Sequence, residues 1–420
     1  MPAERLVLRP PDGGHKILIT EAGIRVPDDP IVPLIEGDGV GPDVVRAARK
    51  AVDATVADAF GGRRRIVWYG VPAGERAMFQ FGEMLPEATL GAIREYVVAL
   101  KGPLTTPVGG GFRSLNVTLR KALDLYANVR PIYWIPGVPS PVTHPERLDI
   151  IIFREGTEDV YAGIEWEKGS AEAARMIDIL EKEFRTHVRP DSGLGVKPVS
   201  ETGSKRLIRK AIRYAIQSGR RSVTLVHKGN IMKYTEGAFR TWGYEVARNE
   251  FGESTIAWDD VAKSYGGQAP KGKVVIKDVI ADNMFQQLLL RPEEYDVLAT
   301  TNLNGDYLSD AAAAQIGGLG VAPGANIGDA HALFEPVHGS APKYAGLDKV
   351  NPTAEILAGV LMLDYLGWRE AAERLRDAVK AVIKSKVVTY DLARQMPDAK
   401  EVGTAAFADA VVGAIRGAGR

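Results

Sequence analysis

The stretch of sequence that decides the fold runs from residue 31 to residue 60 and reads IVPLIEGDGVGPDVVRAARKAVDATVADAF. Its first part, Ile31 to Glu36, is mainly apolar and predicts a buried strand. A glycine-rich turn follows, and Asp43 to Phe60 carries apolar residues at helical spacing. A strand, a glycine turn and a helix in this order predict an α/β fold.

The turn between this strand and this helix reads Gly37-Asp38-Gly39-Val40-Gly41-Pro42. Its spacing differs from the dinucleotide-binding pattern Gly-x-Gly-x-x-Gly, and no such pattern followed by an acidic residue about 20 positions later occurs in the chain. The sequence therefore predicts an α/β fold that is not a standard Rossmann fold.

Strand and helix patterns continue along the rest of the chain. Strands are predicted at residues 149–153, 222–226 and 274–280, and helices at 171–184, 205–217, 353–366, 370–384 and 405–415. Residues 317–328 and 333–344 are predicted to be irregular connections, the first rich in glycine and the second polar. The less regular segment 158–200 is interpreted as an interaction arm, and residues 1–30 are expected to wrap the surface.

Length and composition describe an ordinary globular protein. The chain has 420 residues, 45% of them hydrophobic and 25% charged, which is enough for two or three domains with substantial cores. Lys plus Arg equals Asp plus Glu at 53 each, so no nucleic acid or acidic membrane is expected as a partner. The chain has no cysteine, no apolar signal-peptide core and no membrane-length apolar run, and we expect a cytoplasmic protein.

The segment Asn302 to Asp310 follows an apolar run and contains two carboxylates four residues apart. Gly305 is predicted to break the strand, and the alanines from Ala311 onwards favour a helix, so Asp306 and Asp310 would share one helical face. Two hard oxygen ligands suit Mg2+ or Mn2+. The alternative is a first helical turn enriched in acids, which the helix dipole favours without any metal.

A second segment, residues 101–130, combines glycines with several basic side chains. It contains the glycine run 109–111 and Arg113, Ser114, Asn116, Arg120 and Arg130, and Arg154 follows the next predicted strand. Glycines allow a close backbone approach, and several guanidinium groups suit a substrate with more than one carboxylate. Solvated arginines, or arginines paired to surface acids, are the structural alternative. His227, at the end of another predicted strand, is interpreted as a hydrogen-bonded structural residue.

Over nearly its whole length the sequence resembles the metal-dependent β-decarboxylating dehydrogenases, and among them the bacterial-type NADP-dependent isocitrate dehydrogenases. The likeness rests on the strings LKGPLTTPVGGGFRSLNVTLR, FRE with YAGIEW, VTLVHKGNIMKYTEGAF, NLNGDYLSD, APGANIG and HGSAPKYAG. It implies the isocitrate/isopropylmalate dehydrogenase fold, with a large domain (1–125 and 317–420), a small domain (126–158 and 203–316) and a clasp (159–202). The clasp would interlock with a second subunit, giving a homodimer with shared active sites.

The resemblance also assigns roles at the substrate and metal sites. Arg120, Arg130 and Arg154 would meet the substrate carboxylates, while Ser114 and Asn116 would hold the γ-carboxylate of isocitrate. The Mg2+ or Mn2+ ligands would be Asp306, Asp310 and Asp282 of the partner subunit, and the metal would act as a Lewis acid. Lys228 of the partner subunit would help remove the hydroxyl proton, and Tyr161 would protonate the enolate.

For NADP, the resemblance implies a loop that holds the adenosine and ribose, a contact near the nicotinamide, and a set of groups that read the 2′-phosphate. The loop residues are His338, Gly339, Ser340, Ala341 and Asn351, with Thr105 at the nicotinamide end. The 2′-phosphate would meet Lys343, Tyr344, Tyr390, Arg394 and Arg291 of the partner subunit.

The implied reaction is the oxidative decarboxylation of isocitrate to 2-oxoglutarate and CO2 through oxalosuccinate, a step of the tricarboxylic acid cycle. Some bacterial members are switched off by a kinase at the serine that matches Ser114, so a regulatory kinase is a further expected partner. Isopropylmalate and homoisocitrate dehydrogenases are the rivals within the class, and they lack the Ser114 and Asn116 pairing. A metal-dependent phosphohydrolase or a nucleotide-binding regulator is the rival from outside it.

Overall fold

The computed structural model describes residues 8–21, 23–105 and 114–418. The glycine run 109–111 and Arg113, which the sequence placed near the substrate, lie outside these residues. None of the helices in these residues has the length and hydrophobicity that a membrane-spanning helix requires.

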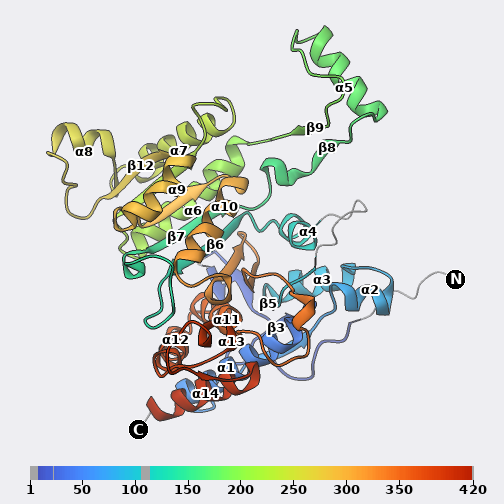
Figure 1. The fold of residues 1–420 in the computed structure, drawn as a ribbon, viewed down its shortest axis with the longest axis vertical. Coiled ribbons are helices and arrows are strands. Elements are labelled where there is room, and N and C mark those ends of the chain that lie inside the picture. The colour runs from blue at the N-terminus through green and yellow to red at the C-terminus, as the bar shows by residue number, and fades with distance from the viewer. Residues whose placement is uncertain (1–7, 22, 106–113, 419–420) are drawn as a thin grey trace.

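One mixed sheet of 11 strands forms the centre of the described structure (Figure 1). In spatial order the strands are β11 (Thr255–Ala257), β12 (Val274–Ile280), β10 (Ser222–His227), β13 (Val297–Thr300), β7 (Asp149–Glu155), β6 (Ala127–Tyr133), β14 (Pro323–Ile327), β15 (Ala332–Pro336), β5 (Val98–Lys101), β3 (Ile31–Ile35) and β4 (Val67–Gly70). Strands pair in parallel on both wings, whereas β6 is antiparallel to both β7 and β14. The predicted α/β class is confirmed.

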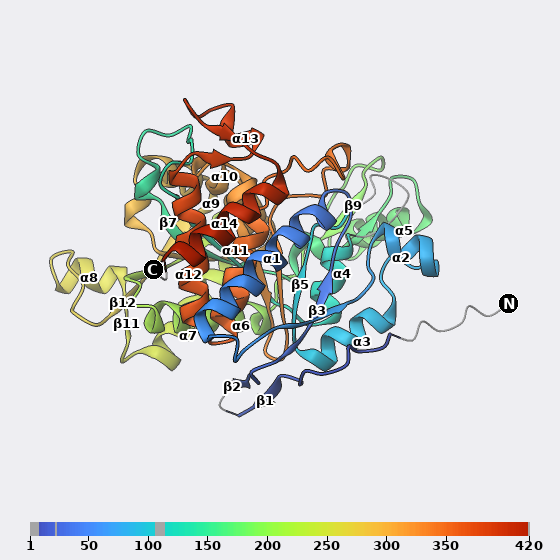
Figure 2. The same cartoon turned by 90° about the horizontal axis from the view of Figure 1, so that it is seen from below.

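Helices from both ends of the chain cover one wing of the sheet. They are α1 (Gly41–Phe60), α11 (Thr353–Tyr365), α12 (Arg369–Lys384) and α14 (Thr404–Ala418), which lie side by side in Figures 1 and 2. The shorter helices α2 (Glu75–Phe81), α3 (Glu87–Tyr96) and α4 (Leu115–Ala122) belong to the same wing. The amphipathic pattern of α12 puts Leu375, Val379 and Ile383 in the core, as helical periodicity predicts.

The other wing is built from the middle of the chain. Its helices are α6 (Glu201–Gln217), α7 (Glu236–Phe251), α8 (Trp258–Ser264), α9 (Ala281–Leu290) and α10 (Asn302–Gln315). The minor elements are the pairs β1 (Leu18–Thr20) with β2 (Gly23–Arg25) and β16 (Val387–Val388) with β17 (Lys400–Glu401), and α13 (Tyr390–Ala393).

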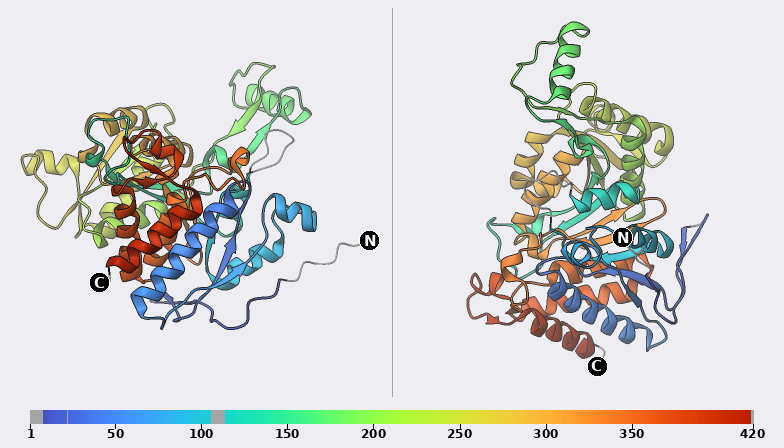
Figure 3. Two further views of the ribbon diagram at one scale, coloured as in Figure 1. Left: turned by 60° about the horizontal axis from the view of Figure 1, so that its bottom comes forward. Right: turned by 90° about the vertical axis from the view of Figure 1, so that its right-hand side faces the viewer.

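An arm formed by β8 (Ile164–Trp166), α5 (Ala171–Lys182) and β9 (Leu194–Val196) stands away from the body of the molecule (Figures 1 and 3). It carries exposed apolar side chains, including Ile164, Phe184 and Val196. The segment that the sequence marked as irregular therefore forms a projection, and its role as a clasp between subunits stays a prediction.

Three expectations from the sequence are wrong in detail. The predicted connections at residues 317–328 and 333–344 contain the central strands β14 and β15. Gly305 does not break a strand, because β13 already ends at Thr300 and α10 begins at Asn302. Instead Gly305 lets α10 approach β7, since a Cβ at this position would lie 2.6 Å from the Cβ of Arg154.

Candidate active site

A cavity of about 210 Å³ lies where the two wings of the sheet meet. Residues predicted from the sequence that line it are Ser114, Asn116, Arg120, Arg130, Arg154, Tyr161, Asp306, His338 and Gly339. They come from α4 and its N-cap, the strands β6 and β7, the 3-10 helix Asp159–Ala162, helix α10 and the segment after β15. Residues separated by more than 200 positions in sequence are thus brought to one site.

Strand register explains why the arginines converge. Arg154 on β7 is paired with Asn128 on β6, and Asn128 is paired with Asn326 on β14. Paired positions point to the same face of a sheet, and Arg130 is two residues from Asn128, so it shares that face. The side chains of β6, β7 and β14 therefore present guanidinium and amide groups together to the cavity side of the sheet.

A buried polar network holds Arg120 in place. The Arg120 Nε donates to Asn326 Oδ1 at 2.8 Å, and its Nη2 lies 3.3 Å from Glu335 Oε1. Lys101 Nζ contacts the other oxygen of Glu335 at 2.5 Å. These cations outweigh the burial cost and hold the pKa of Glu335 far below its usual range. Sequence reasoning missed Lys101, Asn128, Asn326 and Glu335, because their importance depends on partners that are distant in sequence.

The arginines are desolvated and close to one another. Burial, together with repulsion from Arg130 and Arg120, lowers the pKa of Arg154 to about 10. The guanidinium of Arg154 stays protonated at neutral pH. An additional anion in the cavity would stabilise its charge further. The arrangement is therefore suited to a small molecule that carries several carboxylates.

The two aspartates of α10 meet these arginines from the facing helix. Asp306 forms an ion pair with Arg154, and Asp310 Oδ1 lies 3.1 Å from Arg130 Nη1. Tyr161 donates its hydroxyl to Asp306 Oδ2 at 2.5 Å. Burial and this hydrogen bond raise the pKa of Tyr161 to about 12, so its hydroxyl keeps its proton at neutral pH.

The donor chemistry of Asp306 and Asp310 fits a hard divalent cation, but two carboxylates are an incomplete ligand set. Among the described residues of the single chain, no group of three His, Cys, Asp or Glu side chains is placed to hold a metal ion. The third predicted ligand, Asp282, forms an ion pair with Lys228, and neither residue lines the cavity. The side chain of Asp282 is 69% exposed, so it remains accessible to another molecule.

The turn that carries Lys228 is held by hydrogen bonds to His227 and Glu236, which are both buried. His227 Nδ1 accepts the backbone N–H of Gly229 at 2.9 Å, and its Nε2 lies 3.0 Å from Asp278 Oδ2. The backbone N–H of Lys228 donates to Glu236 at 2.5 Å. His227 is therefore hydrogen-bonded and structural in this chain, as predicted.

The predicted cofactor residues form a loop beside the cavity. Ser340 Oγ lies 2.8 Å from Thr105 Oγ1, and the Ser340 carbonyl accepts the N–H of Val40 at 2.9 Å. A Cβ at Gly39 would lie 2.1 Å from that carbonyl oxygen, so the strand-to-helix turn approaches the loop as only glycine permits. The buried Nε2 of His338 has no hydrogen-bond partner among the described residues, which suits a loop that receives a polar ligand.

The predicted 2′-phosphate readers cluster at the outer end of the loop. The rings of Tyr344 and Tyr390 lie 5.8 Å apart, with Lys343 4.9 Å from the Tyr344 ring and Arg394 5.9 Å from the Tyr390 ring. Asn351 instead donates to Asp391 at 3.0 Å. Two exposed cations and two hydroxyls of half-buried tyrosines in one patch fit a phosphate dianion. Arg291, at the end of α9, is not among the residues that line the cavity.

The mixed sheet defines an α/β protein. Its buried guanidinium cluster, which faces two aspartates, suits a polycarboxylate, and the adjacent loop, which a glycine turn approaches closely, suits a phosphate-bearing ligand. The isocitrate/isopropylmalate dehydrogenase family model matches residues 31–411, and the chain belongs to this family.

Proteins with assigned names are similar in sequence to this chain over almost its full length. The NADP isocitrate dehydrogenase of Archaeoglobus fulgidus is 62% identical over 405 residues, covering 96% of this chain and 97% of that protein. The NADP isocitrate dehydrogenase of Haloferax volcanii is 58% identical and covers 97% of each chain. The crystal structure of isocitrate dehydrogenase from Methylococcus capsulatus superposes with a TM-score of 0.75 at 41% identity, covering 92% of this chain and 99% of that one.

Proposed function

We propose that this protein catalyses the NADP-dependent oxidative decarboxylation of isocitrate to 2-oxoglutarate and CO2. The observation that carries the proposal is the buried cluster of Arg120, Arg130 and Arg154, which lines one small cavity together with Asp306. Asp310 pairs with Arg130 at 3.1 Å. A tricarboxylate matches the positive charge of the cluster. Relatives with more than half of their residues identical carry the name NADP isocitrate dehydrogenase.

In the proposed complex, the three guanidinium groups bind substrate carboxylates, and Ser114 with Asn116 holds the γ-carboxylate. Ser114 and Asn116 lie at the start of α4 and line the cavity, which supports this assignment. A buried guanidinium makes stronger charge-assisted hydrogen bonds than an exposed one, because water competes less. The substrate is thereby oriented with its hydroxyl-bearing carbon toward the aspartates of α10.

A bound Mg2+ or Mn2+ would supply Lewis-acid stabilisation of negative charge on the substrate oxygen, and NADP would accept the hydride. Asp306 and Asp310 are the proposed ligands from this chain. Tyr161 is the proposed proton donor to the enolate carbon, because its raised pKa keeps the hydroxyl protonated beside the site. The network around Glu335 keeps Arg120 fixed and limits reorganisation during the reaction.

We further propose a homodimer in which Asp282 and Lys228 of the partner subunit complete each site. The support is that Asp282 and Lys228 pair with each other outside the cavity, while the projecting arm exposes apolar side chains. We also propose the large domain (1–125 and 317–420), the small domain (126–158 and 203–316) and the clasp (159–202), because helices from both chain ends cover one wing of the sheet and the middle of the chain builds the other wing and the arm. The cytoplasmic location and the kinase acting on Ser114 stay predictions.

The test is a spectrophotometric assay of nicotinamide reduction with isocitrate, isopropylmalate and homoisocitrate, each with NADP and with NAD. We expect turnover with isocitrate, NADP and Mg2+ or Mn2+, loss of turnover on chelation, and recovery on adding either metal. A higher kcat/KM for either rival acid would reassign the substrate. Full activity in thoroughly chelated buffer would refute the metal assignment.

A further inference from the structure

A second and larger cavity, here called the rear cavity, lies behind the strands that carry the active site. Its volume is about 720 Å³, within the range of small-molecule sites, and it is lined by residues of β6, β7, β14, β15, α6 and α11. On β6, Asn128 and Arg130 line the active-site cavity, whereas Val129 and Pro131 line the rear cavity. Alternation along the strand therefore separates the two cavities by the thickness of one sheet.

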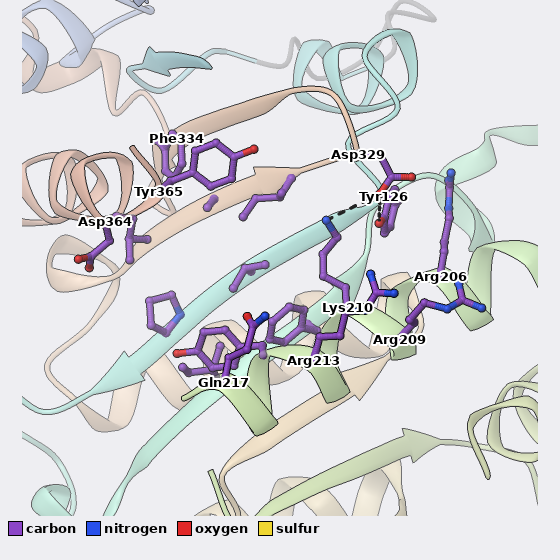
Figure 4. A pocket seen from close by; sticks show the side chains of 18 residues that line it. Tyr126, Arg206, Arg209, Lys210, Arg213, Gln217, Asp329, Phe334, Asp364 and Tyr365 are labelled. Atoms are coloured by element: carbon purple, nitrogen blue, oxygen red, sulfur yellow. Dashed lines mark hydrogen bonds and ion pairs between the residues drawn. The ribbon is translucent and has the colours of Figure 1, made fainter. Parts of the chain in front are cut away.

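The floor of the rear cavity is apolar and aromatic. Phe153 on β7 and Phe334 on β15 contribute from the sheet, and Tyr214 and Tyr365 contribute from the flanking helices α6 and α11. Phe334 and Tyr365 lie next to each other in Figure 4. The ring of Tyr214 lies 5.4 Å from that of Phe153, and the ring of Tyr365 lies 5.6 Å from that of Phe334. Such a surface favours a flat apolar ligand body.

One wall is cationic because α6 presents Arg206, Arg209, Lys210 and Arg213 on one side (Figure 4). Two of these charges are neutralised by acids that do not line the cavity. Arg206 lies 2.8 Å from Asp124, and Arg209 binds Glu250 through two of its nitrogens.

The other two cations lack a close anion. Lys210 Nζ lies 4.0 Å from Asp329, whose same oxygen accepts the Tyr126 hydroxyl at 2.6 Å. Lys210 Nζ also donates to the Gly328 carbonyl at 3.0 Å, which is a neutral partner, and burial lowers the pKa of Lys210. Arg213 is an exposed residue of α6 at the cavity, and its guanidinium has no hydrogen bond or ion pair among the described residues.

The two acids that line the rear cavity do not neutralise Lys210 and Arg213. Asp364 on α11 is paired with Arg376 at 2.7 Å, and Asp329 has the contacts just described. The rear cavity thus combines an aromatic floor with two cations that have no strong anionic partner of their own.

We propose that the rear cavity binds a small organic anion with an aromatic body, one per chain, with its anionic group at Lys210 and Arg213. Its ring would lie against Phe153 and Phe334. This site goes beyond the proposed reaction. Because the sheet separates the two cavities, binding here does not compete with isocitrate.

The probe is anilinonaphthalene sulfonate, which joins an aromatic body to one anionic group and fluoresces in apolar surroundings. The full-length protein is titrated with and without saturating isocitrate and Mg2+, in the absence of NADP. We expect one bound probe per chain and an unchanged Kd when isocitrate is present. The Lys210→Gln/Arg213→Gln double variant should bind at least about tenfold more weakly, because two charge-assisted contacts are lost.

The matched control is Lys205→Gln, which removes a charge from the same helix at a position that does not line the rear cavity. Its Kd should stay within about twofold of the unaltered protein, given the small value of exposed ion pairs. Gln217→Glu, an exposed change at the cavity, adds an anion without disturbing the core and should also weaken binding. The neutral analogue phenylnaphthylamine should bind more weakly than the sulfonate.

Three results would overturn the proposal. Displacement of the probe by isocitrate would place it among the active-site arginines. Equal weakening in the Lys205 and the Lys210/Arg213 variants, or no weakening in either, would show that these two cations do not form the site. Equal affinity for the neutral analogue would reduce the rear cavity to a nonspecific apolar surface.

Discussion

At the scale of single residues, the active site depends on charges that are buried and paired. Arg154 is 1% exposed and donates from its Nε to Asn302 at 2.8 Å as well as pairing with Asp306. Removing one partner of such a pair leaves an uncompensated charge, which costs more than the loss of a surface contact. Substitutions that remove one of these buried charges should therefore lower the free energy of unfolding as well as weaken substrate binding.

Ser114 is the residue where added charge has the clearest expected effect. It occupies the N-cap position of α4 and lines the active-site cavity. Ser114→Glu should lower kcat/KM for isocitrate by roughly a hundredfold or more through repulsion of an anionic substrate, and Ser114→Ala by about tenfold or less. The check is steady-state kinetics beside an NADP Kd, which should change little. Normal isocitrate KM in the Glu variant would place Ser114 outside the substrate site, and equal losses of Tm would favour a capping role.

Lys343 and Tyr344 are the residues expected to select the cofactor. Lys343→Asp with Tyr344→Ile replaces a cation and a hydroxyl by a negative charge and an apolar group, which should repel the 2′-phosphate and shift preference toward NAD. Cofactor specificity is the difference between the binding free energies of NADP and NAD, so kcat/KM must be measured with both cofactors. A double variant that kept its preference for NADP would remove these residues from the 2′-phosphate site.

At the scale of elements, the packing of α10 on β7 sets the position of Arg154. Gly305→Ala would insert a Cβ 2.6 Å from the Arg154 Cβ, so helix and strand must separate. We expect a loss of about 1–3 kcal/mol in the free energy of unfolding and a raised KM for isocitrate. Denaturant unfolding and steady-state kinetics are the measurements.

The control for this change is Gly413→Ala in α14, where an added Cβ meets nothing within 4 Å. It should raise the free energy of unfolding by about 0.5–1 kcal/mol, because alanine loses less backbone entropy in a helix. We expect the change in the free energy of unfolding to have opposite signs in the two variants. A Gly305→Ala variant with an unchanged free energy of unfolding would show that α10 can shift freely.

The strand β12 carries a carboxylate that should make stability depend on pH. Asp278 accepts hydrogen bonds from Tyr244 at 2.7 Å and Arg240 at 2.9 Å, as well as from His227. Burial alone would raise its pKa, but these donors outweigh burial and hold the pKa well below 3.8. A depressed pKa in the folded state means that the stabilisation is complete above pH 3.8 and is lost as the pH falls further.

Asp278→Asn should therefore lower the free energy of unfolding by about 2 kcal/mol at pH 7, with a smaller difference from the unaltered protein below pH 3.8. The exposed Asp260→Asn variant should show almost no difference at either pH. Denaturant titrations at the two pH values give the answer. An equal loss in the free energy of unfolding of Asp278→Asn at acid and neutral pH would mean that the loss comes from altered packing rather than from the removed charge.

At the scale of the whole molecule, the proposed active site needs two chains. Lys228→Met and Asp306→Asn should each abolish most activity alone, because they damage different halves of every site. Mixing the two variants through unfolding and reassembly should restore about a quarter of the normal activity, since half the dimers are mixed and each contains one intact site. Absence of recovery, with mixed dimers shown to be present, would indicate sites built within one chain.

Much of the architecture could be predicted from local pattern. Helix α12 and strand β12 match the predicted ranges within one residue, because hydrophobic periodicity is a property of neighbouring residues. Strand β14 escaped prediction, since its glycine and proline resemble a connection and only its neighbours β6 and β15 complete its hydrogen bonds. The pairing of Asp306 and Asp310 on one helical face was predicted for the same local reason as α12.

Local sequence pattern was sufficient to predict the α/β class, the main helices and the residue types available for polycarboxylate, metal and phosphate binding. Which of these residues meet depends on the tertiary fold. Lys101 and Glu335 are 234 positions apart, and Arg120 and Asn326 are 206 apart, yet both pairs are buried in the same network. Periodicity carries no information about such separations, whereas a buried charge must find its partner wherever the fold places one.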